Sequence, residues 1–192
     1  MLRKIIDWAY TKVFGPPPPN VDLRKARLIE QACSMLEIRG IKNVRVLDLG
    51  CGDCTYAREI AGKCNVVDYV GVDTEPRCNG YNVVRADVQD TGLPSLIGGS
   101  FDVVLMLDIL EHVTNYGMAL SNARKLIRPN GLLLISTIAI PQDNINDAIE
   151  RDPQHVHLYT PELLRRALAR HGFSLVMFWQ EHEILFAIAE PR

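Results

Sequence analysis

Long apolar runs are missing from this sequence, and none approaches the roughly 18 residues that a helix needs to cross a bilayer, so no transmembrane segment is expected. The beginning of the chain also lacks the apolar core and cleavage site of a secretory signal. The five cysteines are an odd number, so we expect reduced thiols in a cytoplasmic protein. A net charge of only −2 argues against a protein that coats DNA, and no DNA partner is expected.

The length and composition are those of one globular domain. The chain has 192 residues, of which 47% are apolar and 23% charged, enough to build a core without disulfide or metal support. The charge is unevenly distributed. Residues 1–45 hold nine Lys/Arg and four Asp/Glu, or +5, and the remainder sums to −7. This basic region is interpreted as a solvated face, with a surface for an anionic ligand as the alternative.

The first 20 residues form a separate segment in this prediction. Apolar residues recur at helical spacing over residues 2–14, and the four prolines at 16–19 end that helix and favour a stiff spacer. A second helix is predicted over about 22–38, with Asn20 or Asp22 as its N-cap and Gly40 at its end. The predicted division is therefore a helix and proline spacer over 1–20 and a single domain over 21–192.

From residue 44 onward, predicted strands and helices alternate. Such alternation indicates a parallel sheet with helices on both faces, in which ligands bind beyond the carboxyl ends of the strands. The chain closes with two strands that read as a hairpin. The strands are predicted at 44–49, 66–72, 83–86, 101–107, 132–138, 174–179 and 184–189, and the helices at about 52–61, 115–127 and 160–170.

The most informative segment, residues 46–55, places Asp48 before two glycines, Gly50 and Gly52. A dinucleotide-binding turn needs a third glycine where this chain has Thr55, and no Gly-Lys-Ser/Thr of a Walker loop follows. Glycines let the main chain come close to a ligand, whereas a neighbouring acid repels phosphate. The segment therefore favours a ligand that carries cationic groups.

This segment resembles the first motif of the class I S-adenosylmethionine (SAM) dependent methyltransferases, D/E-x-G-x-G-x-G, with Cys54 at the last glycine. The resemblance continues in order over about residues 43–190, and the Glu-His-Val at 111–113 is like the small-molecule branch of that family. It implies an α/β fold with a Rossmann-like, doubly wound, seven-stranded sheet. That sheet is mostly parallel with an antiparallel last strand, and N-terminal helices are added to it.

The resemblance also implies a cofactor, a site and an activity. The cofactor is SAM, and the activity is methyl transfer to an oxygen or nitrogen of a small-molecule acceptor. Two alternatives stay open: a non-catalytic SAM-binding or interaction module, and a methyltransferase that acts on RNA or a lipid-linked acceptor. Asp73 matches the acid that binds the ribose hydroxyls, and residues 85–88 match the adenine-contacting motif. The implied SAM-binding residues are Asp48, Gly50, Cys51, Gly52, Asp73, Thr74, Asp87, Val88 and Leu107.

Two departures from the family pattern have structural consequences. Cys54 in place of glycine is acceptable only if that position does not need a positive φ. Only nine residues separate Asp73 from Val83, fewer than a helical crossover needs. We therefore expect a turn near residues 75–77 instead of a helix, and a more open adenine side of the pocket.

The cysteines admit three interpretations. Cys51 and Cys54 form a C-x-x-C at a strand-to-helix turn, as in redox sites. Cys64 and Cys78 could complete a set of four zinc ligands, although they lack a second paired knuckle. The favoured interpretation is that the cysteines are small packed side chains.

Asp108, Glu111 and His112 follow the fourth predicted strand and are candidate bases for the acceptor's proton. His112 suits pH 7 best, and a histidine of the surface or polar core is the alternative. His155 and His157 have a spacing that could chelate a metal, but no carboxylate partner is evident and no metal is predicted. We expect residues 1–20 to border the acceptor site, with binding to a membrane surface as the alternative.

Overall fold

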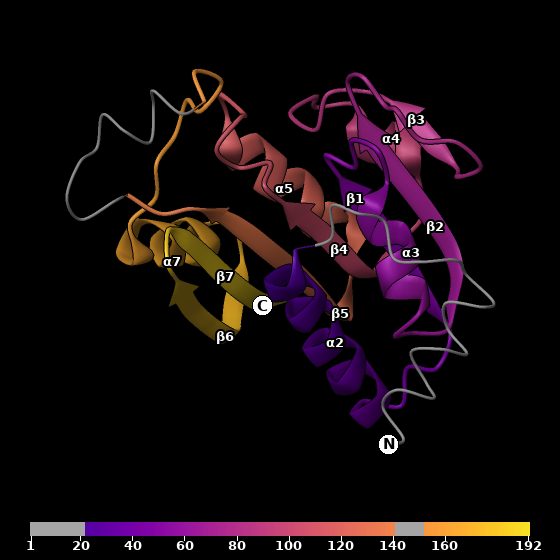
Figure 1. The fold of residues 1–192 in the computed structure, drawn as a ribbon. Helices are drawn as coiled ribbons and strands as arrows, with labels where there is room; N and C mark the ends of the chain where they lie inside the picture. Colours follow the sequence, from indigo (N-terminus) through magenta and orange to yellow (C-terminus); the bar gives the residue numbers. More distant parts are fainter. Residues whose placement is uncertain (1–21, 141–151) are drawn as a thin grey trace.

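The computed structural model describes residues 22–140 and 152–192 (Figure 1). The helix and proline spacer predicted for residues 1–20 lie outside this range, as does most of the predicted connection over 139–159. The elements are α2 (Leu23–Ile38), β1 (Val44–Leu49), α3 (Thr55–Ala61), β2 (Val66–Asp73), β3 (Val83–Arg85), α4 (Leu93–Ile97), β4 (Phe101–Leu107), α5 (Tyr116–Leu126), β5 (Ile127–Ile138), α7 (Pro161–Arg170), β6 (Phe173–Glu181) and β7 (Ile184–Pro191).

The strands form one seven-stranded sheet in the order β3-β2-β1-β4-β5-β7-β6. The five strands from β3 to β5 are parallel, and β7 runs antiparallel to both of its neighbours. This is the Rossmann-like, doubly wound sheet that the sequence predicts. The strand order reverses beside β1, so the carboxyl ends of β1 and β4 border the switch point where such sheets bind ligands.

Alternate residues of the central strands face two separate cores, as a sheet covered on both faces requires. On one face, Val46 and Leu105 pack with α2 and α3. On the other face, Leu47 and Met106 pack with α4, α5 and α7. Among the helices of residues 22–140 and 152–192, none combines the length and the apolar character of a membrane span.

The helix ends follow the predicted capping chemistry. Of the two candidate caps, Asp22 starts α2, and its carboxylate accepts the amide of Arg24 at 2.8 Å. Thr160 starts α7 in the same way, with Pro161 at the first helical position. The described segment between β2 and β3 contains no helix, as predicted, and its chain bends at residues 74–75.

Two parts of the fold differ from the prediction. The five-residue helix α4 was not predicted, because it is too short to show helical periodicity. Strand β5 begins at Ile127 instead of 132, and its register against β4 shifts between Phe101 and Val103. Pro129 cannot donate to the ladder, so the first residues of β5 pair irregularly and regular pairing starts at Leu132.

Asp102, which is almost fully buried at the amino end of β4, ties three strands together. One carboxylate oxygen accepts the Arg45 amide of β1 at 2.8 Å, and the other accepts the Arg128 guanidinium of β5 at 2.6 Å. Asp102→Ala is therefore expected to lower the free energy of unfolding by about 2 kcal/mol, measured by chemical denaturation.

A matched control is Asp68→Ala. Asp68 also pairs with Arg45, at 2.8 Å, but both side chains are about one-third exposed. Such a surface pair contributes about 1 kcal/mol or less. Equal losses for the two variants would contradict the bridging role of Asp102.

Candidate functional site

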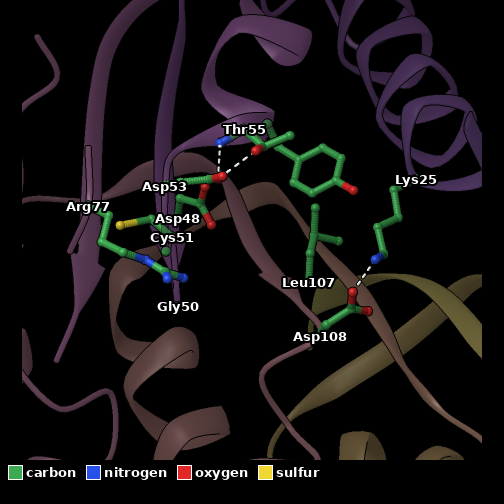
Figure 2. Close-up of a pocket in the computed structure, with 11 residues that line it drawn as sticks. Lys25, Asp48, Gly50, Cys51, Asp53, Thr55, Arg77, Leu107 and Asp108 are labelled. Carbon is green, nitrogen blue, oxygen red and sulfur yellow. Dashed lines mark hydrogen bonds and ion pairs between the residues drawn. The ribbon is translucent and has the colours of Figure 1, made fainter. Parts of the chain in front are cut away.

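Two cavities adjoin at the carboxyl ends of the parallel strands, and Gly50 lines both. The first has a volume of about 300 Å³ and lies between the loop after β1, helix α2 and the end of β4 (Figure 2). The second has a volume of about 250 Å³ and lies between the ends of β2, β3 and β4. Of the predicted residues, Asp48, Gly50, Cys51, Gly52 and Leu107 line the first cavity, and Gly50, Asp73, Thr74, Asp87, Val88 and His112 line the second.

The loop after β1 is fixed to the neighbouring strand by its backbone. The amides of Gly50 and Cys51 both donate to the Val72 carbonyl, at 2.8 and 3.1 Å. Gly50 has a φ of +83°, and a Cβ there would lie 2.7 Å from Ile109 Cδ1. Gly52 has a φ of +52°, and a Cβ there would meet no atom within 4 Å. Gly50 is therefore required by both conformation and space, whereas Gly52 has open space beside it.

Asp73, at the end of β2, is held in one orientation by two backbone amides. Its Oδ2 accepts from Gly52 at 2.9 Å, and its Oδ1 accepts from Glu75 at 2.8 Å. An ionised carboxylate has about four acceptor positions, so both oxygens keep capacity for a further donor in the second cavity.

Asp48, which lies just before the loop, is a buried acid whose carboxyl accepts a hydrogen bond from a neutral donor. Tyr69 donates its hydroxyl to Asp48 Oδ2 at 2.8 Å. Burial raises the pKa of Asp48 to about 7, the nearby Asp73 and Asp53 add to this, and the Tyr69 hydrogen bond opposes it. A cation in the first cavity would favour the ionised form of this carboxyl.

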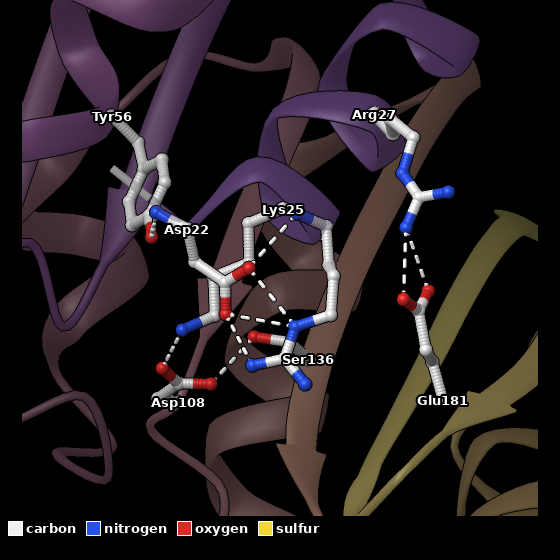
Figure 3. A network of polar contacts seen from close by, with 8 residues as sticks. Asp22, Lys25, Arg27, Tyr56, Asp108, Ser136 and Glu181 are labelled. Carbon is white, nitrogen blue, oxygen red and sulfur yellow. Dashed lines mark hydrogen bonds and ion pairs between the residues drawn. The ribbon is translucent and has the colours of Figure 1, made fainter. Parts of the chain in front are cut away.

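Lys25 forms the opposite wall of the first cavity and pairs with Asp108 after β4 (Figure 3). The other oxygen of Asp108 accepts the Ser136 hydroxyl at 2.7 Å. Burial acts to lower the pKa of Lys25, but the charge and hydrogen bond of Asp108 outweigh it and raise that pKa. Sequence reasoning missed Lys25, although it stands at helical spacing with the buried Leu28 and Ile29 on α2.

His112, the predicted base, lies beside a second histidine and a buried acid. Its Nδ1 is buried and has no hydrogen-bond partner among the described residues, and its ring centroid lies 4.9 Å from that of His155. Glu111 accepts the Thr137 hydroxyl at 2.8 Å. Burial, followed by the charge of Asp108, raises the pKa of Glu111 to about 7.

Glu111, His112 and His155 offer donor atoms within 4.8 Å of one another, a set that could hold a divalent cation. No carboxylate partner of His155 is evident in the sequence, and the structure corrects this expectation by placing Glu111 beside it. His157 is separate from the cluster, because its Nε2 lies 3.2 Å from the Thr114 carbonyl and its ring meets the edge of Tyr116. His155 and His157 are therefore not placed together as a chelating pair.

The expectation of five reduced thiols is wrong in this structure. Cys33 bonds to Cys64, and Cys54 bonds to Cys78, while Cys51 alone keeps a free thiol. Cys54 has a φ of +59°, so the condition under which cysteine would replace glycine without strain is not met. The two disulfides also remove the proposed four-cysteine zinc set. The C-x-x-C cysteines are not paired with each other, because the helix-free segment after β2 brings Cys78 to Cys54.

Comparison with known proteins agrees with this geometry. The family described as "Methyltransferase domain" matches residues 20–177. A ubiquinone biosynthesis O-methyltransferase from Rhizobium etli is 26% identical over 195 residues, covering 88% of this chain and 77% of that protein. One of the same name from Azorhizobium caulinodans is 34% identical over 114 residues, covering 53% of this chain and only 43% of that protein.

A solved structure shows the same fold. The magnesium protoporphyrin IX methyltransferase from Synechocystis PCC 6803, with bound SAH, matches with a TM-score of 0.63 and 16% identity, covering 100% of this chain and 98% of that one. The family match, the sheet order and the loop after β1 lead to one conclusion. The chain belongs to the class I methyltransferases that use SAM.

Proposed function

We propose that this protein transfers a methyl group from SAM to an oxygen or nitrogen of a small-molecule acceptor, and that SAM lies across the two adjoining cavities. One observation carries the proposal. All nine residues implied by the family motifs, from four separate parts of the chain, line these two cavities. The curated relatives named above are O-methyltransferases, which supports an oxygen acceptor.

The charges in the first cavity suit the amino-acid end of SAM. That end carries an ammonium and a carboxylate, and the sulfonium that bears the methyl group joins it to the ribose. Asp48, Asp53 and Asp108 supply negative charge, and Lys25 and Arg77 supply positive charge on the same walls. Opposite charges in a partly buried cavity favour such a ligand over a neutral one.

The second cavity suits the adenosine end. The Asp73 carboxylate can accept both ribose hydroxyls in charge-assisted hydrogen bonds. Val88, Ile109 and Val113 supply apolar surface for the adenine ring. The residues present therefore fit the cofactor along its whole length.

His112 is proposed as the group that takes the proton of the acceptor. When bound, SAM supplies the electrophilic methyl group on its sulfonium. The chain has to orient the acceptor, exclude water and accept a proton. His112 lines the second cavity, and within residues 22–140 and 152–192 its buried Nδ1 has no hydrogen-bond partner.

Calorimetry with S-adenosylhomocysteine (SAH), the demethylated product, tests the cofactor site. Asp73→Ala is expected to weaken binding at least about tenfold, because the ribose hydroxyls lose a charged acceptor. Asp68→Ala is the matched control: it changes an acid on the same strand that pairs with Arg45 outside both cavities, and it should bind normally. Absence of binding to the wild type, or unchanged binding to Asp73→Ala, would refute the site.

The raised pKa of Asp48 predicts a pH dependence of SAM binding. The folded pKa of about 7 exceeds the usual 3.8, so without ligand the carboxyl is mostly protonated below pH 7. The contribution of this group to the stability of the fold is fully present below pH 3.8 and is lost as pH rises from there through 7. A cationic ligand needs the ionised form. SAM affinity is therefore expected to rise about tenfold from pH 6 to pH 8.

Asp48→Asn separates this group from Glu111, whose pKa is also about 7. The variant should bind SAM weakly and with little dependence on pH. A wild-type affinity that does not change between pH 6 and pH 8, or an equal slope in Asp48→Asn, would exclude Asp48 as the group that faces the cation.

Methyl transfer from labelled SAM to a panel of phenols and amines tests the role of His112. His112→Gln is expected to lower kcat by about 10²- to 10⁴-fold and to change SAH affinity little. A chelator should leave the wild-type rate unchanged. Loss of activity with chelator, restored by a divalent cation, would instead make His112 a metal ligand. Transfer only to RNA or a lipid-linked acceptor, or to no acceptor, would favour the corresponding alternative function.

A further inference from the structure

Three sulfur atoms gather under the loop that lines both cavities. The Sγ atoms of Cys51, Cys54 and Cys78 lie within 4.8 Å of one another, and Cys54 and Cys78 are bonded. The free Cys51 Sγ lies 4.0 Å from Cys78 Sγ. The family motif has glycine at the position of Cys54, and glycine cannot form a disulfide. The Cys54–Cys78 bond is therefore not part of that motif.

Cys54 occupies a backbone conformation that cysteine rarely adopts. Its φ of +59° lies in the left-handed region, where a Cβ crowds the following carbonyl. No side-chain hydrogen bond from Cys54 caps the helix that follows. The bond to Cys78 is therefore the side-chain restraint that holds this residue in the left-handed turn.

Cys78 belongs to the helix-free segment after β2, which lies against the loop. The Arg77 amide donates to the Gly52 carbonyl at 2.9 Å, and Cys78 Sγ lies 3.3 Å from the same oxygen. The segment begins beside Asp73 and Thr74 in the second cavity, and Arg77 lines the first (Figure 2). The disulfide thus joins two neighbouring stretches of chain that both line the proposed cofactor site.

The thiol of Cys51 is poorly placed and poorly reactive for thiol–disulfide exchange with the Cys54–Cys78 bond. Gly71 lies directly beneath it, since a Cβ there would come within 2.8 Å of Cys51 Sγ. Burial, followed by the charges of Asp48 and Asp73, raises the pKa of Cys51 to about 12. Its thiol stays protonated at neutral pH and is a poor nucleophile, so Cys54 keeps Cys78 as its partner.

We propose that Cys54 and Cys78 are a redox modification site that controls the conformation of the loop after β1. A dithiol reductant opens the disulfide, and the oxidised form of that reagent, itself a disulfide, can restore it. The proposal rests on the proposed function, because the effect on catalysis follows from SAM binding at this loop. Cys78 is half-buried and Cys54 is almost fully buried, so the reductant attacks Cys78 Sγ.

The exchange balances as a two-electron step. A thiolate of the dithiol bonds to Cys78 Sγ, the Cys54–Cys78 bond breaks, and the electron pair leaves on Cys54. The second thiol of the reagent then displaces Cys78. Both cysteines take up protons, and the reagent is released as its own disulfide. The loop after β1 is then free to leave the left-handed turn at Cys54. SAM binding would have to restore that turn, so its affinity would fall.

The test compares oxidised and dithiothreitol-reduced full-length protein by equilibrium dialysis with labelled SAH. Reduction is expected to weaken binding about tenfold. Cys54→Gly should bind equally with and without reductant, because glycine adopts this turn freely. The Cys33→Ser/Cys64→Ser variant, which lacks the other disulfide, should still respond as the wild type does.

Thiol alkylation and peptide mapping confirm which bond opens, and hydrogen exchange of residues 50–56 reports the loop without any ligand. Faster exchange of these amides after reduction supports the proposal. Equal SAH affinity in the two forms despite an open Cys54–Cys78 bond, or unchanged exchange, would overturn it. If no form binds SAH, the proposed function fails, and the exchange data still decide whether the disulfide controls the loop.

Discussion

Two hydrogen bonds to one carbonyl oxygen hold the site together. The amides of Gly50 and Cys51 both donate to the carbonyl of Val72, so the loop after β1 is seated on the end of β2. This places Gly52 where its amide reaches Asp73 and brings Gly50 to the junction of the two cavities. A side chain at Gly50 would push the loop off Ile109 and open the junction. The positions of both cavities therefore depend on these two hydrogen bonds.

The electrostatics of the site follow from the same placement. Asp48 and Asp73 lie at the carboxyl ends of adjacent parallel strands, so their charges converge on the loop, and the charge of Asp73 adds to the effect of burial in raising the pKa of Asp48. The Lys25–Asp108 pair balances charge at the other wall of the first cavity and connects α2 to the end of β4. Asp108 itself has a φ of +54°, a conformation that aspartate tolerates better than most residues. The resulting cavity carries both signs of charge, as a zwitterionic ligand requires.

Much of this arrangement could be predicted from the sequence, because strand ends and glycine turns leave local signals. Asp73 closes an apolar run and Asp48 lies one residue before the end of another, and the parallel order then brings both to one edge of the sheet. Contacts between distant segments leave no such signal. The Cys54–Cys78 pairing and the meeting of Glu111 with His155 depend on how loops fold back, and spacing along the chain does not encode that. Lys25 was detectable in principle as a charge within an apolar stripe, but its pairing with Asp108 was not.

The most direct test of this account is a crystal structure of the protein with SAH bound. We expect the ribose hydroxyls to bond to the Asp73 carboxylate, with the amino-acid end beside Asp48 in the first cavity and the adenine against Val88 in the second. SAH bound elsewhere, or a ribose with no contact to Asp73, would contradict the proposed cofactor site.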